Sequence, residues 1–302
     1  LTRLVKVGLS EVAFHVDTTQ RRQGYPTEAS LNTVRTEYIE RARGLGLMIV
    51  FNTTVHTDNF LEVPDLARFF VQNADAIGLV SFQLQAETGR GEWGSRSFQV
   101  TRASVAEQIA QGVGPLPWDR IKVGHPECHS YVPTLVAGNR VLPVLENQAF
   151  FESFMGDFAD MNWDRHQGVL RLAASGAWAI LRAPGSWPRL ARQAVHYLKL
   201  FGPPVLKGQR LHKLSFFVQN FMDASALDAD RVHACSFMVM TNEGPVSMCE
   251  HNARRDDFIL QPLEVAKEDG SIVHYQPLKP GQRPAPSPLE SQPERIPLVS
   301  LQ

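Results

Sequence analysis

Alternating apolar and polar residues predict strands and helices in turn over the first 120 residues. Period-two runs predict three strands, at 12–17, 48–54 and 79–85. Apolar residues at helical spacing predict three helices, at 27–43, 63–74 and 104–112, the first ending near Gly44 and Gly46 and the last capped by Ser104. Strands that alternate with helices are typical of a parallel sheet covered by helices, so the pattern predicts an α/β fold.

The three predicted strands each have one apolar and one polar face. Successive side chains point to opposite sides of a strand, which groups an apolar set of Phe14, Val16, Ile49, Phe51, Val80, Phe82 and Leu84. The opposite set is polar: His15, Asp17, Asn52, Thr54, Ser81, Gln83 and Gln85. Because a closed barrel usually fills its interior with Val, Ile and Leu, this polar face indicates a lumen that holds a polar ligand at the C-terminal strand ends. The alternative is a network of buried polar groups that satisfy one another.

The pattern changes after residue 120. Residues 130–136 and 141–145 flank Ala137-Gly138-Asn139 and predict a hairpin. Three more strands are predicted at 214–222, 235–240 and 246–249, the last two forming a hairpin around Asn242-Glu243-Gly244. Ser186 is the predicted cap of a helix over 187–201 that stops at Gly202-Pro203-Pro204.

A stripe of phenylalanines marks one further predicted helix. Its members recur at helical spacing: Phe150, Phe151, Phe154, Phe158 and Met161. Such a stripe usually belongs to the hydrophobic core. The alternative is that it lines the access path of a hydrophobic substrate.

The predicted organisation has three parts. Residues 1–120 form part of a partial β/α barrel, 121–272 an α+β domain, and 273–302 a tail whose Pro, Gly, Gln and Ser content predicts disorder. The chain starts at Leu1 without an initiator methionine, in what resembles the last turns of a helix ending at Gly8. We therefore expect it to be the C-terminal part of a longer protein.

Composition excludes several classes of protein. The net charge of -1 argues against a nucleic-acid partner. No apolar run reaches the roughly 20 residues of a transmembrane helix. Three cysteines cannot form a disulfide framework, so we expect a reducing cytoplasm.

Each of the three cysteines has a histidine within two residues. The motifs are His125-Pro-Glu-Cys128-His129, His233-Ala-Cys235 and Cys249-Glu-His251. Thiolate and imidazole bind soft and borderline metals, so Cys128, Cys235 and Cys249 are candidate ligands of an iron–sulfur cluster or of zinc. The spacing does not match the short Cys-x2-4-Cys motif of structural zinc sites. Buried thiols acting as small hydrophobes, or a cysteine nucleophile, are the alternatives.

Two segments resemble a known family. QNFMDASALDADRVHAC (219–235) followed by GPVSMCEHN (244–252) is similar to the C-terminal cluster region of radical S-adenosylmethionine (SAM) enzymes of the archaeal tetraether lipid synthase and dihydropterin dimethyltransferase branch. VSFQLQAETGR (80–90) resembles its fifth barrel strand, and HPEC (125–128) a cysteine motif that follows. The resemblance covers roughly residues 1–262, and the stretch from Met222 to Asn252 is its most specific part.

The resemblance implies a specific cofactor chemistry. A 4Fe–4S cluster would cleave SAM reductively to a 5'-deoxyadenosyl radical, which abstracts hydrogen from an unactivated carbon in radical C–C coupling or methylation. Cys128, Cys235 and Cys249 would hold an auxiliary cluster, and the polar strand residues would contact SAM: His15, Asp17, Asn52, Thr54, Gln83 and Gln85. The substrate would be a lipid or a small, pterin-like molecule, and a ferredoxin or flavodoxin would supply electrons.

The chain departs from the family pattern in two ways. It lacks the three-cysteine motif of the SAM-cleaving cluster and the Gly-rich strand after it, so the segment alone is expected to be inactive. Val123 stands where the family has a cysteine five residues before Cys128. A non-catalytic module stapled by zinc or a structural cluster, and a β/α protein without metal, remain the alternative hypotheses.

Overall fold

The computed structural model describes residues 1–88, 100–145, 147–159, 169–182, 185, 187–267 and 269–277. Its helices are α1 Thr2–Lys6, η1 Thr18–Gln20, α2 Glu28–Ala42, η2 Phe60–Glu62, α3 Val63–Gln72, α4 Arg102–Val113, α5 Gln148–Asp157, α6 Val169–Arg182, α7 Trp187–Leu206, α8 Ala229–His233, α9 Met248–Ala253 and α10 Arg255–Ile259. Its strands are β1 Glu11–His15, β2 Met48–Val55, β3 Ile77–Leu84, β4 His129–Val132, β5 Thr134–Ala137, β6 Arg140–Pro143, β7 Leu211–Lys213, β8 Ser215–Asn220, β9 Met238–Thr241, β10 Gly244–Ser247, β11 Leu263–Ala266 and β12 Ile272–Tyr275.

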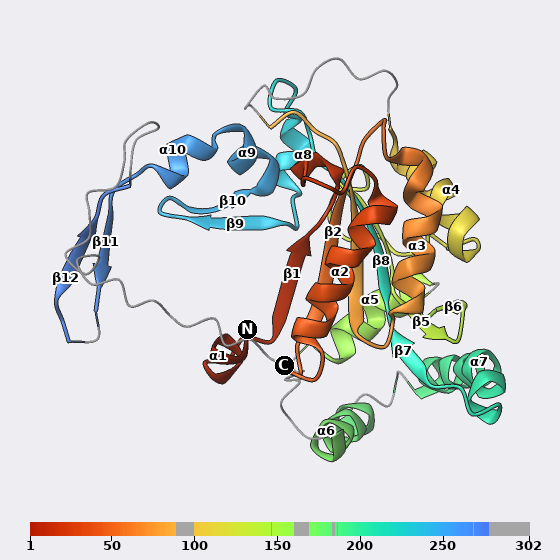
Figure 1. Cartoon of the computed structure of the whole chain (residues 1–302). Coiled ribbons are helices and arrows are strands. Elements are labelled where there is room, and N and C mark those ends of the chain that lie inside the picture. Colours follow the sequence, from red (N-terminus) through yellow and green to blue (C-terminus); the bar gives the residue numbers. More distant parts are fainter. Residues whose placement is uncertain are drawn as a thin grey trace.

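A five-stranded sheet forms the centre of the molecule, in the order β1-β2-β3-β8-β4 (Figure 1). β1, β2, β3 and β8 are parallel, and β4 pairs antiparallel with β8. The predicted α/β class is confirmed. In the described residues this sheet has two edges, β1 and β4, and it extends past residue 120 because β4 and β8 belong to it.

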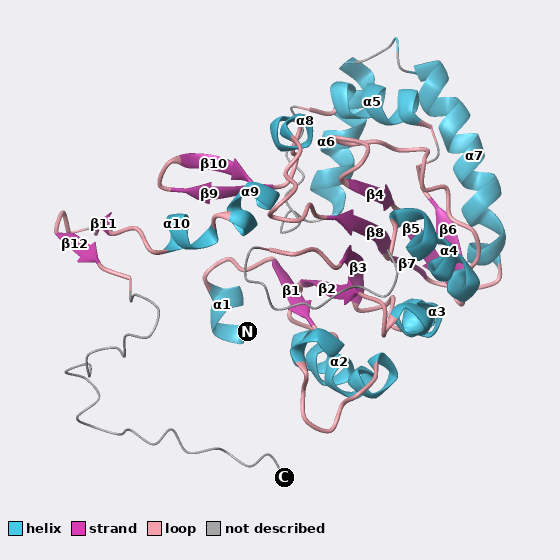
Figure 2. Cartoon of the chain, turned by 90° about the horizontal axis from the view of Figure 1, so that it is seen from above, coloured by secondary structure: helices cyan, strands magenta, loops and turns pink. Residues whose placement is uncertain are grey.

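The apolar strand face lies under α2, α3 and α4, which follow one side of the sheet in Figure 2. Six of its predicted members are buried: Val16, Ile49, Phe51, Val80, Phe82 and Leu84. The seventh, Phe14, is partly buried against the core. β-branched and aromatic residues on one strand face pack well against helices, and their burial supplies the main stabilisation of this half of the chain.

α4 begins earlier than predicted. Thr101 is its N-cap, and Ser104 is the third helical residue. Each side chain accepts a hydrogen bond from the other's backbone N–H, at 3.0–3.1 Å. The prediction of Ser104 as the cap was wrong because Thr101 satisfies one of the first unpaired N–H groups a turn earlier.

α7 does not stop at Gly202-Pro203-Pro204. Both prolines lie inside the helix, which continues to Leu206. Proline's fixed φ is helical, and its missing N–H costs only single hydrogen bonds close to the helix end. The helix ends where Gly208 adopts φ +72, with Gln209 N–H donating to the Pro204 carbonyl at 3.0 Å. Ser186, the predicted cap, lies outside the described residues.

The predicted bounds of two strands were wrong at the cysteines. Cys235 lies between α8 and β9, not in a strand, and Cys249 lies in the first turn of α9. β9 and β10 do form the predicted antiparallel hairpin. The Ser247 side chain accepts a hydrogen bond from Glu250 N–H at 3.1 Å, so it caps α9 and ends β10.

The hairpin predicted around Gly138 is β5–β6, confirmed as an antiparallel pair. The strand predicted at 130–136 is divided at Pro133, so that β4 joins the main sheet and β5 a second sheet with β6 and β7. Proline has no N–H for a strand ladder, which favours the change of sheet.

The phenylalanine stripe lies on α5 and just after it. Phe158 is buried, whereas Phe150 and Phe154 are half-buried and line a pocket described below. Met161 lies outside the described residues. The predicted tail lies outside them from residue 278 on, and its predicted start at residue 273 falls within β12. None of the helices in the described ranges is both long and apolar enough to cross a bilayer.

Candidate cofactor site

The strand register aligns polar residues in two rows across the sheet. One row pairs His15 with Asn52, Asn52 with Ser81 and Ser81 with Phe217. The next pairs Thr54 with Gln83, Gln83 with Gln219 and Gln219 with His129. Since residues in register lie on one face of a sheet, the polar face continues from β1 to the edge strand β4.

Asp17 ties the ends of β1 and β2 together. Its carboxylate is fully buried and accepts hydrogen bonds from Thr54 N–H at 2.7 Å, from Thr19 N–H at 3.0 Å and from the Thr19 hydroxyl. His15 Nε2 lies 2.7 Å from the same carboxylate. Asp17 therefore positions His15 and Thr54, because none of its own surface is exposed to a ligand.

The charge state of this pair follows from its contacts. Burial opposes ionisation of Asp17, but the hydrogen bond and charge of His15, with the bonds from Thr19 and Thr54, lower its pKa to about 2. The hydrogen bond to Asp17 raises the pKa of His15 above its usual value, against the opposing effect of burial. The pair is therefore ionic at mildly acidic pH.

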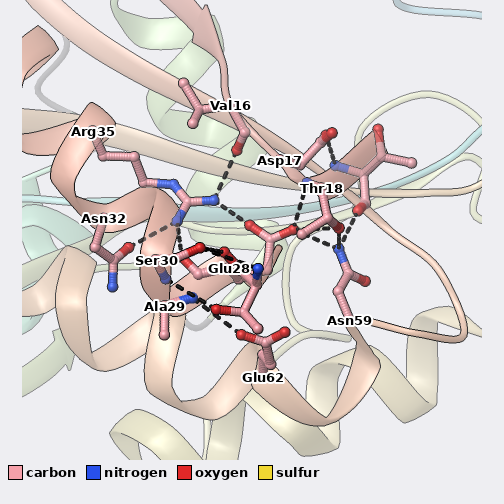
Figure 3. Close-up of polar contacts among 12 residues, drawn as sticks. Val16, Asp17, Thr18, Glu28, Ala29, Ser30, Asn32, Arg35, Asn59 and Glu62 are labelled. Atoms are coloured by element: carbon pink, nitrogen blue, oxygen red, sulfur yellow. Dashed lines mark hydrogen bonds and ion pairs between the residues drawn. The ribbon is translucent and has the colours of Figure 1, made fainter. Parts of the chain in front are cut away.

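A second network lies beneath it, between η1, α2 and η2 (Figure 3). Arg35 is fully buried, forms an ion pair with Glu28, and donates to the carbonyls of Glu28 and Val16, each at 2.8 Å. Glu28 Oε1 also accepts from Thr18 N–H at 2.9 Å and from the Asn59 amide at 2.8 Å. Burial lowers the pKa of Arg35, and Glu28 opposes that effect.

Both sequence interpretations of the polar face therefore apply, in different places. At the ends of β1 and β2 the polar groups satisfy one another. Further across the sheet, the side chains of Asn52, Gln83 and Gln85 are half-buried and form no hydrogen bond within the described part of the chain. These three amides, with His15 and Thr54 at the edge of the network, are the groups able to contact a polar ligand.

Cys128, Cys235 and Cys249 line one pocket at the far end of the polar row. Other residues of its wall include His129, Gln219, Met222, Arg231 and Ser236. Cys128 immediately precedes β4 and Cys249 lies in α9, and both are buried, whereas Cys235 is half-buried. Three thiols distant in sequence thus meet where Gln219 and His129 complete the polar row.

The thiols differ in their surroundings. Cys249 Sγ accepts a hydrogen bond from Met222 N–H at 3.4 Å, and Cys235 Sγ donates to the Phe237 carbonyl at 3.1 Å. Burial raises the pKa of Cys249, and negative charge on Cys235 and Cys128 raises it further, while the Met222 N–H and Arg231 oppose the rise.

Two polar atoms in this wall have no hydrogen-bond partner among the described residues. They are Oε1 of the buried Gln219 and the enclosed Nε of the half-buried Arg231. His251 Nδ1, two residues after Cys249, is also buried without a partner. Leaving a buried polar atom unpaired costs about 1–3 kcal/mol, so each marks a place where a further ligand atom would be favourable.

The donor types fit a soft metal or an iron–sulfur cluster, but the present arrangement is narrow. The pocket has a volume of about 10 Å³, which is space for a single water. Within the described ranges, no three Cys, His, Asp or Glu side chains are arranged to hold a metal ion as they stand. Binding would require Cys235 to lose its S–H proton, and with it the hydrogen bond to the Phe237 carbonyl.

The loop before Cys128 lies against this pocket as well. Gly124 has φ +65, and a Cβ at that position would lie 2.8 Å from Ser236 Oγ and 3.3 Å from the Ala234 carbonyl. Residue 124 therefore has to be glycine for the loop to approach the neighbours of Cys235. Val123, beside it, is 39% exposed.

Several residues of the polar networks and of the pocket wall were not singled out as site residues by the sequence interpretation. Gln219 belongs to β8, whose position next to β3 no local pattern indicates. Glu28 and Arg35 lie two helical turns apart, a spacing that usually marks an exposed charged face. The positions of Arg231 and His129 follow only from the tertiary fold.

No protein-family model matches the chain, and no curated protein has a sequence similar to it. Any assignment of function therefore depends on the residues and their geometry.

Proposed function

We propose that the chain is the cofactor-binding segment of a radical SAM-type iron–sulfur enzyme. The observation that carries the proposal is the convergence of Cys128, Cys235 and Cys249 on one pocket at the end of a polar sheet face. In this proposal the parallel sheet is part of a partial β/α barrel. The reaction class is modification of an unactivated C–H bond by radical C–C coupling or methylation, on a lipid or pterin-like substrate.

The roles of the residues follow from their surroundings. The three thiolates would hold an iron–sulfur cluster, and His129, which lines the same pocket, is a candidate for a fourth ligand position. When bound, the cofactors would supply one-electron reduction and a carbon-centred radical. An electron donor such as a ferredoxin or flavodoxin is then required.

The polar face would orient SAM. Asn52, Gln83 and Gln85 have amide groups available to the ribose and amino-acid moieties of a nucleoside ligand, and His15 and Thr54 border them. Asp17 acts as a positioning residue, because its carboxylate fixes His15 and Thr54 and is itself enclosed.

Anaerobic purification of the whole chain tests the proposal. Iron and acid-labile sulfide in equal amounts, with a broad visible absorbance bleached by dithionite, are expected for a cluster. Serine substitution of all three cysteines should abolish the absorbance, whereas the matched control Ser236→Ala, in the same wall, should retain it. Absence of iron and sulfide after anaerobic reconstitution would overturn the assignment.

A zinc-stapled module is the second candidate, and the small pocket volume favours it because one ion needs less space than a four-iron cluster. Stoichiometric zinc without sulfide, with a lower Tm after chelation, would identify this module.

The loop at Val123 offers a gain-of-function test. Val123 precedes the glycine that lies against Ser236, so Val123→Cys would add a fourth thiol near Cys235. We expect this variant to bind more iron and sulfide per chain than the unaltered protein and to lose them more slowly in air. Val7→Cys is the control. Val7 is 81% exposed and lies between α1 and β1, so a thiol there should change neither the iron and sulfide content nor the rate of their loss in air.

A further inference from the structure

α6 and α7 carry an unusual charge pattern. Residues 169–210 contain seven of the 30 basic residues of the chain, Arg171, Arg182, Arg189, Arg192, Lys199, Lys207 and Arg210, and none of its 31 acidic residues. The chain as a whole is close to neutral, so positive charge is concentrated in this segment, in which Arg189 also pairs with Asp157 of α5 at 3.6 Å. Such a segment attracts a polyanionic surface.

The same helices expose large apolar side chains. Their exposed fractions are: Leu170 88%, Trp178 57%, Leu181 60%, Trp187 48%, Val195 51%, Leu198 71%, Val205 52% and Leu206 89%. Scattered exposed hydrophobic residues are ordinary, but a group this dense on two consecutive helices marks an interaction surface.

Apolar and basic positions on α7 form adjoining stripes. At 100° per residue, Ala191, Val195 and Leu198 lie on one arc of the helix, together with Leu206 further along. Arg192 and Lys199, two turns apart, border this arc, and both are exposed. Long basic side chains beside an apolar stripe can lay their stems on it while the charge reaches a headgroup layer.

A pocket behind the surface is apolar. Phe150 and Phe154 of α5, Ile180 and Trp187 line it with Tyr197, whose hydroxyl donates to the Val144 carbonyl at 3.0 Å. Its volume is about 660 Å³. Trp187 is both an exposed residue of this surface and part of the pocket wall, so apolar space adjoins the surface at that residue.

We propose that α6 and α7 form a docking surface for an anionic lipid bilayer, with the helices lying in the headgroup layer and not crossing it. A basic helix with Trp and Leu on its apolar side matches an interfacial helix. An acidic protein partner would match the positive charge, but an anionic bilayer matches both the charge and the exposed Trp178 and Trp187 at its polar–apolar boundary. Figure 1 draws α6 below the sheet and α7 at its lower right beside β7, both away from α8 and α9.

The proposal does not depend on the cluster, and lipid binding by the whole chain tests it. We expect the protein to co-sediment with phosphatidylglycerol/phosphatidylcholine vesicles, not with pure phosphatidylcholine vesicles, and to bind less at high salt. The tryptophan fluorescence should shift to the blue on binding. Leu198→Glu/Leu206→Glu should abolish binding, whereas Leu61→Glu, at a position 79% exposed elsewhere, should not.

A charge series separates electrostatic from apolar attraction. Arg192→Gln/Lys199→Gln should weaken binding to the anionic vesicles about 25-fold, from a loss of about fivefold per basic residue. The exposed control pair Lys122→Gln/Arg140→Gln should leave it unchanged.

Three results would overturn the proposal: no binding to anionic vesicles, equal binding by Leu198→Glu/Leu206→Glu, or a stable dimer in solution that buries these helices and excludes vesicles. Sedimentation velocity of the free protein distinguishes the last of these.

Discussion

Arg35 is the largest charged side chain enclosed in the core, and its environment leaves little tolerance for change. Its guanidinium donates hydrogen bonds to the Glu28 carboxylate and to the carbonyls of Glu28 and Val16. It also donates to the side-chain oxygen of Asn32 at 2.7 Å. Removing one member of such a group leaves the other charge buried without compensation, which is more costly than removing both.

We expect Arg35→Met to lower the free energy of unfolding by about 3–5 kcal/mol, because the Glu28 carboxylate remains buried. Glu28→Gln/Arg35→Met should recover part of that loss, since an amide oxygen can still accept from Thr18 and Asn59. Urea unfolding measures both. Arg41→Met, at an exposed pair with Glu37, should change the stability by less than about 1 kcal/mol. A double variant less stable than the single variant would contradict the argument.

The His15–Asp17 pair should make stability depend on pH. The folded-state pKa of Asp17, about 2, lies below its unfolded value, so its stabilisation is present above about pH 4 and is lost as the pH falls toward 2. The raised pKa of His15 acts in the opposite sense. Its contribution is complete below about pH 6.5 and disappears as the pH rises through the folded-state value.

His15→Gln should therefore remove part of the loss of stability above neutral pH. The effect should be at most about 1 kcal/mol, because the imidazole is 42% exposed. Chemical denaturation across a pH series measures it. The control His274→Gln, in an exposed pair with Glu264, should keep the wild-type profile, and an unchanged profile for His15→Gln would refute the assignment.

At the scale of elements, the contact between α3 and α4 depends on a missing side chain. A Cβ on Gly112 would lie 2.4 Å from the Pro64 carbonyl oxygen, which is backbone and cannot rotate away. Close approach of two helices at a glycine is a constraint of shape that composition does not reveal.

We expect Gly112→Ala to destabilise the protein by about 1–3 kcal/mol, as other overpacked sites do. Gly156→Ala in α5 has no atom within 4 Å of the added methyl group, and alanine favours a helix by about 1 kcal/mol, so this control should be neutral or stabilising. Differential scanning calorimetry provides the comparison. Equal Tm values for the two variants would show that α3 and α4 can move apart.

Local patterns predicted the elements of the first half well. Thr27 caps α2 and Arg43 ends it, and β2 and β3 match their predicted runs within two residues, because capping and period-two burial act within a few residues. Patterns failed where tertiary contacts decide, as at Cys249, which a cap by Ser247 moves into a helix. The pocket at the cysteines depends on the placement of β8 and α9, and no spacing in the sequence encodes that.

The whole molecule has regions of very different burial. β3 lies in the middle of the sheet and is mostly buried, whereas every residue of the strands β11 and β12 is exposed. An isolated two-stranded hairpin is at best marginally stable in water.

Native-state hydrogen exchange should reflect this difference. Amides of β3 should exchange only through global unfolding, and those of β11–β12 should exchange within the fastest resolved times. Mass spectrometry of peptides over 77–84 and 263–275 measures both. Strong protection of the second peptide would indicate that β11–β12 is covered by a partner.

The pairing of β3 with β8 has a consequence for how the chain is made. β3 pairs with β2 on one side and with β8 on the other. β8 starts at Ser215, so a ribosome has to synthesise the whole stretch from residue 85 to residue 214 before this second neighbour emerges. Until then the nascent chain presents an open, apolar strand edge, which is a template for aggregation. Chains terminated before residue 215 should therefore depend on chaperones or be degraded, whereas chains terminated after β8 should be able to pair β8 with the exposed edge of β3.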